Sequence, residues 1–236
     1  MQVMGNETMG LQELATYLQR DAREVSKWAS RGYLPGQKVS GEWRFHRAEI
    51  NQWLETQMPG YSEQELAALE QGGSPRSDEE PLLSVYLSEA TTAVPLRAQT
   101  RKSVLKELVA LAEQSWQVYD PAALLTAIET REEMGSTAQV NGVAIPHPRR
   151  PLPNVLGETV IAYGRTATGI PFGEPSGIET DIFFLVACRD DRTHLSVLAR
   201  LARLMLRPNF LDSLRAAATP SETFQLIEEA ERELIA

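Results

Sequence analysis

A single histidine stands where a short apolar run meets two arginines. The segment 141–150 reads NGVAIPHPRR, so His147 directly follows Pro146 and precedes Arg149 and Arg150 by two and three residues. An imidazole with an ordinary pKa of about 6.5 is a nitrogen nucleophile when it is neutral. Guanidinium groups match the oxygens of a phosphate. The pattern would suit a histidine that accepts a phosphoryl group, but on local chemistry alone the plain alternative, a histidine at the end of a strand beside solvated arginines, is the more common one.

The segments around His147 must position it, and they predict a layered α/β domain over residues 81–236. Short apolar runs at 143–145, 159–163 and 182–188 are typical of strands, and the last is apolar enough for a central strand. Capped or amphipathic segments predict helices over 100–116, from Asp120-Pro121 towards Met134, from a Thr193 cap to Leu206, and from Pro220 onwards. Helices before, between and after short strands indicate a sheet flanked by helices.

Two groups of residues in this domain carry a family resemblance. The first runs Arg131-Glu132-Glu133, Ser136-Thr137 and 142–147, and the second runs 169–172, 181–185, 193–195 and 198–204. In this order they resemble enzyme IIA of the fructose/mannitol class of the phosphoenolpyruvate:sugar phosphotransferase system, which includes the nitrogen-regulatory IIA proteins.

The resemblance implies a fold and a set of roles. It implies a mixed sheet flanked by helices, with His147 as the phosphorylated residue and His194 as a second histidine contacting the phosphoryl group. Arg131 and Thr137 correspond to residues placed around that site. It implies a phosphohistidine carrier rather than an enzyme of many turnovers, and it requires neither a cofactor nor a metal.

One position departs from the family pattern. Many members have glycine after the active histidine, whereas Pro148 follows His147 here. Proline has no backbone N–H to donate to a phosphate. Arg149 and Arg150 are therefore candidate phosphate contacts in place of that donor.

A second kind of pattern occupies the first 56 residues. Apolar residues at helical spacing over 11–18, a helix over 22–30 capped by Asp21, an alternating stretch over 37–45, and a helix over 47–54 follow one another. Helix, turn, helix, hairpin, helix is the order of a winged helix-turn-helix. The segment 11–54 resembles the excisionase-type, MerR-related DNA-binding family, so residues 1–56 are interpreted as a DNA-binding domain.

The basic residues of this domain divide between its second helix and its hairpin. In such modules the second helix enters the major groove and the wing follows the backbone. The candidate DNA contacts are Arg23, Ser26, Lys27 and Arg31 on the helix, and Lys38, Arg44 and Arg47 on the wing side. One small, nearly neutral module binds DNA weakly, so we expect a homodimer or a partner.

Charge and composition predict a linker between the two domains and a location for the protein. The net charge is −9, and residues 56–80 carry Arg76 against six acids. Together with the Gly-Gly-Ser-Pro run at 72–75, this predicts an acidic linker over 57–80. No transmembrane segment or secretory signal is visible. The single cysteine, Cys188, excludes intrachain disulfides, so a cytoplasmic location is expected.

These patterns combine into one expected function and two alternatives. The expected protein is a cytoplasmic regulator in which an HPr-like phosphocarrier protein phosphorylates His147 and thereby controls binding to DNA. The first alternative is a transport component that passes phosphate to a sugar-specific IIB partner. The second is a binding or sensor module that is never phosphorylated.

Overall fold

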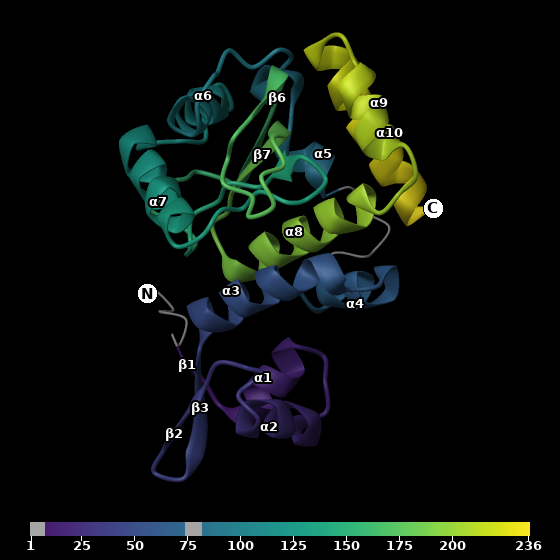
Figure 1. Ribbon diagram of the computed structural model, residues 1–236. Helices are drawn as coiled ribbons and strands as arrows, with labels where there is room; N and C mark the ends of the chain where they lie inside the picture. Colours follow the sequence, from purple (N-terminus) through teal and green to yellow (C-terminus); the bar gives the residue numbers. More distant parts are fainter. Residues whose placement is uncertain (1–7, 74–81) are drawn as a thin grey trace.

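The computed structural model of the chain describes residues 8–73 and 82–236, which form a small N-terminal part and a larger α/β part (Figure 1). Residues 1–7 of the predicted first domain and 74–80 of the predicted linker lie outside the described residues. None of the described helices is both long enough and apolar enough to cross a bilayer.

A four-stranded mixed sheet forms the centre of the α/β part. Its strands, in the spatial order β4-β6-β7-β5, are β4 (Thr92–Ala93), β6 (Val160–Ile170), β7 (Thr180–Ala187) and β5 (Val143–Ala144). β6 and β7 are antiparallel, whereas β4 runs parallel to β6 and β5 runs parallel to β7. The predicted mixed sheet and the interior position of the 182–188 run are confirmed.

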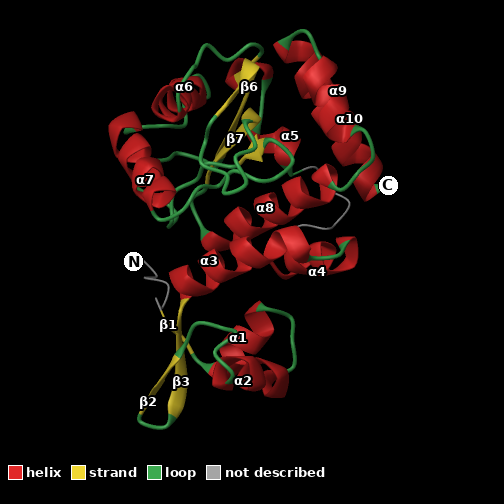
Figure 2. Cartoon of the chain, viewed as in Figure 1, coloured by secondary structure: helices red, strands yellow, loops and turns green. Residues whose placement is uncertain are grey.

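Helices cover both faces of this sheet because β7 is apolar on both. Ile182, Phe184 and Val186 pack in one core cluster, and the alternate residues Phe183 and Leu185 pack in the other. The first cluster includes residues of α8 (Asp191–Met205), α9 (Phe210–Ala216), α10 (Pro220–Ile235) and α5 (Leu83–Tyr86). The second includes residues of α6 (Arg101–Glu113) and α7 (Pro121–Glu133). The result is a helix, sheet, helix layering, as Figure 2 shows. A 3-10 turn, η2 (Glu89–Thr91), leads into β4.

Side-chain caps fix the helix starts. Asp120 accepts the backbone N–H of Ala123, and Pro121 takes the first helical position of α7, as predicted. The prediction for α8 is wrong by one turn. Its cap is Asp190, whose carboxylate accepts the N–H of Thr193, so Thr193 already lies within the first turn.

The N-terminal part contains the predicted helix-turn-helix order. Its elements are β1 (Thr8–Met9), α1 (Leu11–Tyr17), α2 (Ala22–Ser30), β2 (Gln37–Val39), β3 (Glu42–His46) and α3 (Arg47–Gln57). The three strands form an antiparallel sheet in the order β1-β3-β2. The predicted Asp21 cap of α2 is confirmed, and Gly32, with φ of 72°, follows the end of that helix.

A further helix joins the two parts. After the short 3-10 turn η1 (Met58–Gly60), α4 (Glu63–Gly73) lies within the segment for which a linker is predicted, and it packs along α8 (Figure 1). Glu70 of α4 is buried and pairs with Arg200 and Arg203 of α8, and Ser196 donates to the Glu70 carbonyl oxygen at 3.0 Å. The N-terminal part is therefore attached to the α/β part through both α3 and α4.

Candidate functional site

His147 lies at the exit of β5, on a segment held by the neighbouring strand. The Pro146 carbonyl oxygen accepts the N–H of Val186 in β7 at 3.0 Å. The imidazole is only 3% exposed, and its Nδ1 faces the Ile145 carbonyl oxygen at 2.7 Å. The strand and this local contact fix the ring, so that Nε2 points away from the sheet towards α8.

His194 approaches the same point from the first turn of α8. The Asp190 cap starts the helix, and the His194 N–H bonds the Asp190 carbonyl oxygen. The two imidazole rings lie 5.0 Å apart between centroids, and His194 is 6% exposed. Two segments 47 residues apart in sequence thus bring two histidines to one position.

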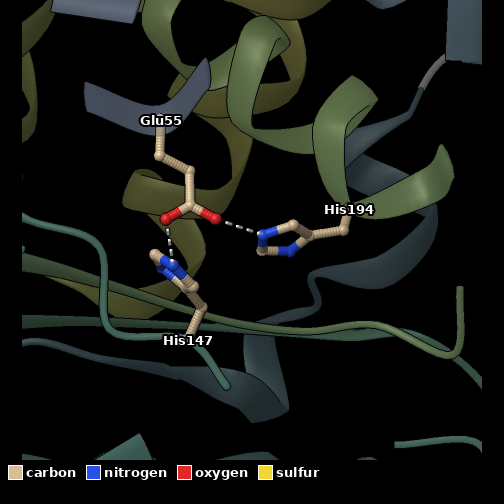
Figure 3. Close-up of side chains that lie close together, drawn as sticks. All are labelled: Glu55, His147 and His194. Atoms are coloured by element: carbon tan, nitrogen blue, oxygen red, sulfur yellow. Dashed lines mark hydrogen bonds and ion pairs between the residues drawn. The ribbon is translucent and has the colours of Figure 1, made fainter. Parts of the chain in front are cut away.

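A carboxylate from the N-terminal part fills the space between these rings (Figure 3). Glu55 of α3 places Oε2 3.0 Å from Nε2 of His147 and Oε1 3.2 Å from Nε2 of His194. Arg131, in the last turn of α7, donates to Glu55 Oε2 at 3.1 Å and to the Gly135 carbonyl oxygen at 3.0 Å. The Glu55 side chain is 9% exposed, so an anion lies among three nitrogen donors almost out of contact with water.

The electrostatics of this cluster favour an ionised carboxylate. Burial by itself would raise the pKa of Glu55, but the charge of His147 and the hydrogen bonds from His147 and His194 outweigh it and lower that pKa from its ordinary value. Burial lowers the pKa of His194, because it disfavours the charged imidazolium, and the hydrogen bond from His194 to Glu55 opposes this shift. His194 can remain neutral here and donate its Nε2 proton to Glu55.

His147 faces an acceptor at each ring nitrogen. The Ile145 carbonyl oxygen lies at Nδ1 and the Glu55 carboxylate lies at Nε2. Both contacts are hydrogen bonds only when the ring carries both protons. When Glu55 leaves, the Ile145 carbonyl still holds the proton on Nδ1, which leaves the Nε2 lone pair free as a nucleophile.

Thr137 lies outside this cluster and contacts a different carboxylate. Its hydroxyl and its N–H both donate to the carboxylate of Glu132, which is 2% exposed. Arg101 donates to the same carboxylate at 2.7 Å. Among the described contacts Thr137 has none with His147 or Glu55, so it orders the turn after α7 that also receives the Arg131 hydrogen bond.

The two arginines after the histidine do not join the cluster. Pro148 is buried, Arg149 is half-buried and Arg150 is exposed. Within the described part of the chain, neither guanidinium contacts His147, His194 or Glu55. The structure brings His147, His194 and Arg131 together, and Arg149 and Arg150 remain outside in this arrangement.

Glu55 is the site residue that sequence reasoning did not identify. It lies 92 residues from His147 and 139 from His194, in a helix assigned to the DNA-binding domain. Its spacing from Asn51 is the one usable signal. The two residues are at positions i and i+4 and therefore share one face of the helix. Two polar residues on one face mark a side of the helix that does not pack into the core of its own domain.

Asn51 forms a second polar contact between the two parts. It is 2% exposed, donates to Asp191 Oδ1 at 2.6 Å, and accepts the hydroxyl of Tyr17 at 2.7 Å. Asp191 and His194 are three residues apart in the first turn of α8. One face of α3 therefore meets the N-terminal turn of α8 through two side chains on each helix.

The predicted DNA contacts fall into two environments. Arg23 and Lys27 are exposed on α2, Arg31 is exposed at the C-cap directly after it, Ser26 is half-buried on the same helix, and Lys38 is exposed on β2. Arg44 is exposed on β3 and pairs with Glu42 at 2.8 Å. Arg47 instead lies at the start of α3, where its guanidinium stacks over Tyr17 and pairs with Glu13. The basic residues of the second helix and of the hairpin are therefore accessible, whereas Arg47 contacts two residues of α1.

The cluster could also accommodate a cation. Glu55, His147 and His194 each offer one ligand atom, and these atoms lie within 4.8 Å of one another. Two imidazoles and a carboxylate are a ligand set that zinc accepts. The hydrogen bonds and the ion pair with Arg131 account for the same arrangement by protons alone.

The lowered pKa of His194 predicts a pH dependence. As the pH falls through about 6.5, His194 takes up a proton in the unfolded chain but stays neutral in the folded chain. The free energy of unfolding should therefore fall as the pH drops from 7.5 to 5.5. His194→Gln keeps an N–H donor and removes the titration, so its loss over this range should be smaller. Urea titrations at each pH measure the difference, and equal slopes for the two proteins would contradict it.

The fold and the paired histidines define an enzyme IIA-like domain joined to a helix-turn-helix domain. The profile described as "Phosphoenolpyruvate-dependent sugar phosphotransferase system, EIIA 2" matches residues 85–230, and that of a "Helix-turn-helix domain" matches residues 8–58. The chain belongs to the EIIA 2 family of the phosphotransferase system, with a helix-turn-helix domain at its N-terminal end.

Known relatives place the α/β part in the same group. The nitrogen regulatory protein of Escherichia coli is 31% identical over 151 residues, which are 63% of this chain and 91% of that protein. The fructose-specific EIIABC component of Bacillus subtilis is 26% identical over 64% of this chain, which spans only 24% of that longer protein. The crystal structure of IIA-Ntr from Neisseria meningitidis superposes with a TM-score of 0.56 at 23% identity, covering 62% of this chain and 99% of that one.

Proposed function

We propose that this chain is a cytoplasmic transcription regulator whose phosphorylation on His147 controls DNA binding by its helix-turn-helix domain. One observation carries the proposal. His147, His194 and Arg131 converge on one anion in a buried site, and α3 of the DNA-binding domain supplies that anion. The E. coli relative is named as a nitrogen regulatory protein, which supports a regulatory use of such a domain.

The chemistry requires only the groups in the cluster. The lone pair of Nε2 on deprotonated His147 attacks phosphorus as the N–P bond to the phosphohistidine of an HPr-like phosphocarrier breaks. The donor's ring nitrogen keeps the electron pair of that bond, and the donor ring, which is protonated on its other nitrogen, leaves as a neutral imidazole. The proton of His147 stays on Nδ1 and is donated to the Ile145 carbonyl oxygen, so the phosphorylated ring is an imidazolium beside the phosphoryl dianion, and His194 and Arg131 donate to the phosphoryl oxygens.

The basic face of α2 supports the DNA-binding half of the proposal. Arg23, Lys27 and Arg31 are exposed, and they have no ion pair within the described part of the chain. Side chains at this spacing share one face of a helix, which suits insertion into the major groove. The near-neutral domain makes dimerisation part of the same proposal.

The test is DNA binding by the two phosphorylation states. A binding sequence selected from random duplexes is titrated with protein before and after treatment with phosphoenolpyruvate, enzyme I and an HPr-like phosphocarrier. We expect the dissociation constants to differ by about 5-fold to 150-fold, the range of a typical coupling free energy. Equal constants for fully phosphorylated and unmodified protein would contradict the control of DNA binding.

A transport role is a second candidate. The B. subtilis relative carries the printed name of a fructose-specific EIIABC component, which favours transfer onward to a IIB domain. Transfer of labelled phosphate from the purified protein to a IIB domain, with no specific DNA binding, would support this candidate. A chain that takes up no phosphate at all would instead be the sensor module.

A further inference from the structure

The position of Glu55 relative to His147 has a steric consequence. Oε2 lies 3.0 Å from Nε2, the nitrogen that would form the bond to phosphorus. A covalent N–P bond is shorter than this distance, so a phosphoryl group on Nε2 would occupy the space of the carboxylate. The two anions would also share Arg131 and His194 as donors. They cannot both be present.

The carboxylate also acts on the nucleophile itself. While Glu55 is in place, Nε2 of His147 holds its proton in a hydrogen bond and offers no lone pair. His147 and His194 are 3% and 6% exposed, and α3 lies over them, so a donor has no direct path to Nε2. While α3 is packed against α8, which we call the docked state, Nε2 of His147 has no lone pair for attack and no phosphodonor can reach it.

The contacts beside Glu55 show that it belongs to an interface. Asn51, one turn earlier on α3, bonds Asp191, which lies three residues before His194. Glu70 on α4 pairs with Arg200 and Arg203 further along α8. α3 and α4 thus follow α8 with matched polar groups, and Glu55 is the part of this interface that enters the histidine site.

We propose that Glu55 is an internal competitor for the phosphoryl position, so that docking of α3 and phosphorylation of His147 exclude one another. This inference rests on the proposed function and adds the device that couples its two domains. Glu55 is a regulatory residue here and takes no part in the transfer. The α2 face remains exposed while α3 is docked, so the device changes how the DNA-binding domain is held and does not cover its DNA-binding surface.

The experiment uses phosphoramidate, a small phosphodonor, on the full chain, with and without EDTA. We expect Glu55→Gln and Glu55→Ala to take up phosphate about tenfold faster than the wild type or more, because the first removes the charge of the acceptor that holds the closed state and the second removes the acceptor itself. Glu49→Gln is the matched control, since Glu49 is an exposed acid on the same helix. Uptake is followed by mass spectrometry of the intact protein.

A second measurement probes the packing of α3 against α8 without relying on the rate of phosphoryl transfer. Hydrogen exchange of the peptide covering α3 should become faster in Glu55→Gln, and faster in the wild type once it is phosphorylated, while the Glu49→Gln control stays at the wild-type rate. Circular dichroism confirms that each variant is folded. Unmodified and phosphorylated wild type should differ in the same peptides that distinguish Glu55→Gln.

The outcomes separate the inference from the function on which it rests. Equal uptake and equal exchange in wild type and both Glu55 variants would overturn the inference and leave His147 an acceptor. No uptake in any of these proteins would overturn the proposed function. If EDTA alone accelerates uptake by the wild type to the rate of Glu55→Gln, a bound metal ion holds the closed state. The inference that the Glu55 carboxylate itself competes for the phosphoryl position would then be wrong.

Discussion

Replacing His147 by alanine should abolish phosphate uptake from an HPr-like phosphocarrier. Nε2 of this ring is the atom held at the centre of the cluster, and no other described side chain offers a nucleophile there, because His194 donates from its own Nε2 to the anion. The phosphate on the wild type should be lost in acid and retained in base, as expected for an N–P bond. Autoradiography of the intact protein measures the loss.

Two further variants make this prediction specific. His194→Gln should still be labelled, at a rate lower by about 10²-fold, because one donor to the developing charge is weakened. His46→Gln, in the helix-turn-helix domain and away from the cluster, should be labelled like the wild type. Labelling of His147→Ala at the wild-type level would show that the phosphate is carried elsewhere.

Replacing Glu231 by alanine should lower the free energy of unfolding by about 3–5 kcal/mol, the cost typical of removing one partner from a buried ionic network. Glu231 is 0% exposed and accepts the N–H groups of Leu82, Leu83 and Ser84 at the start of α5. It also accepts Arg200 at 2.8 Å. Its loss leaves buried backbone donors and part of a buried guanidinium without acceptors.

The matched control lies one turn away on the same helix. Glu228 forms an ion pair with Arg232 at 3.3 Å, and both side chains are more than a third exposed. Glu228→Ala should therefore cost less than about 1 kcal/mol. Chemical denaturation of the two variants gives the comparison, and equal losses would contradict the role assigned to burial.

Local patterns predicted most of the fold. The doubly apolar run at 182–188 indicated an interior strand because a strand buried on both faces shows no polar alternation, and β7 is such a strand. Asp21 and Asp120 predicted helix starts because their side chains satisfy free N–H groups. The prediction of Thr193 as the cap of α8 was wrong. A threonine before an apolar stretch resembles a cap, but here the Thr193 N–H is itself capped by the Asp190 carboxylate.

The site was less accessible to such reasoning because it depends on contacts between distant segments. A nucleophile before two arginines is visible in sequence, but the direction in which Arg149 points is not. Apart from its i, i+4 spacing from Asn51, nothing local distinguishes Glu55 from Glu49 on the same helix; the difference arises when one face of α3 meets α8. Which of these acids contacts the other domain is set by tertiary packing.

The attachment of α4 along α8 has a consequence for the strength of Glu55 as a ligand. A free carboxylate would bind the histidine pair weakly, but α4 tethers α3 beside the site through Glu70, Arg200 and Arg203. Short tethers give effective concentrations in the millimolar range. Glu55 therefore competes at a concentration set by the covalent chain. Whether the site is closed should be independent of how much of the protein a cell contains.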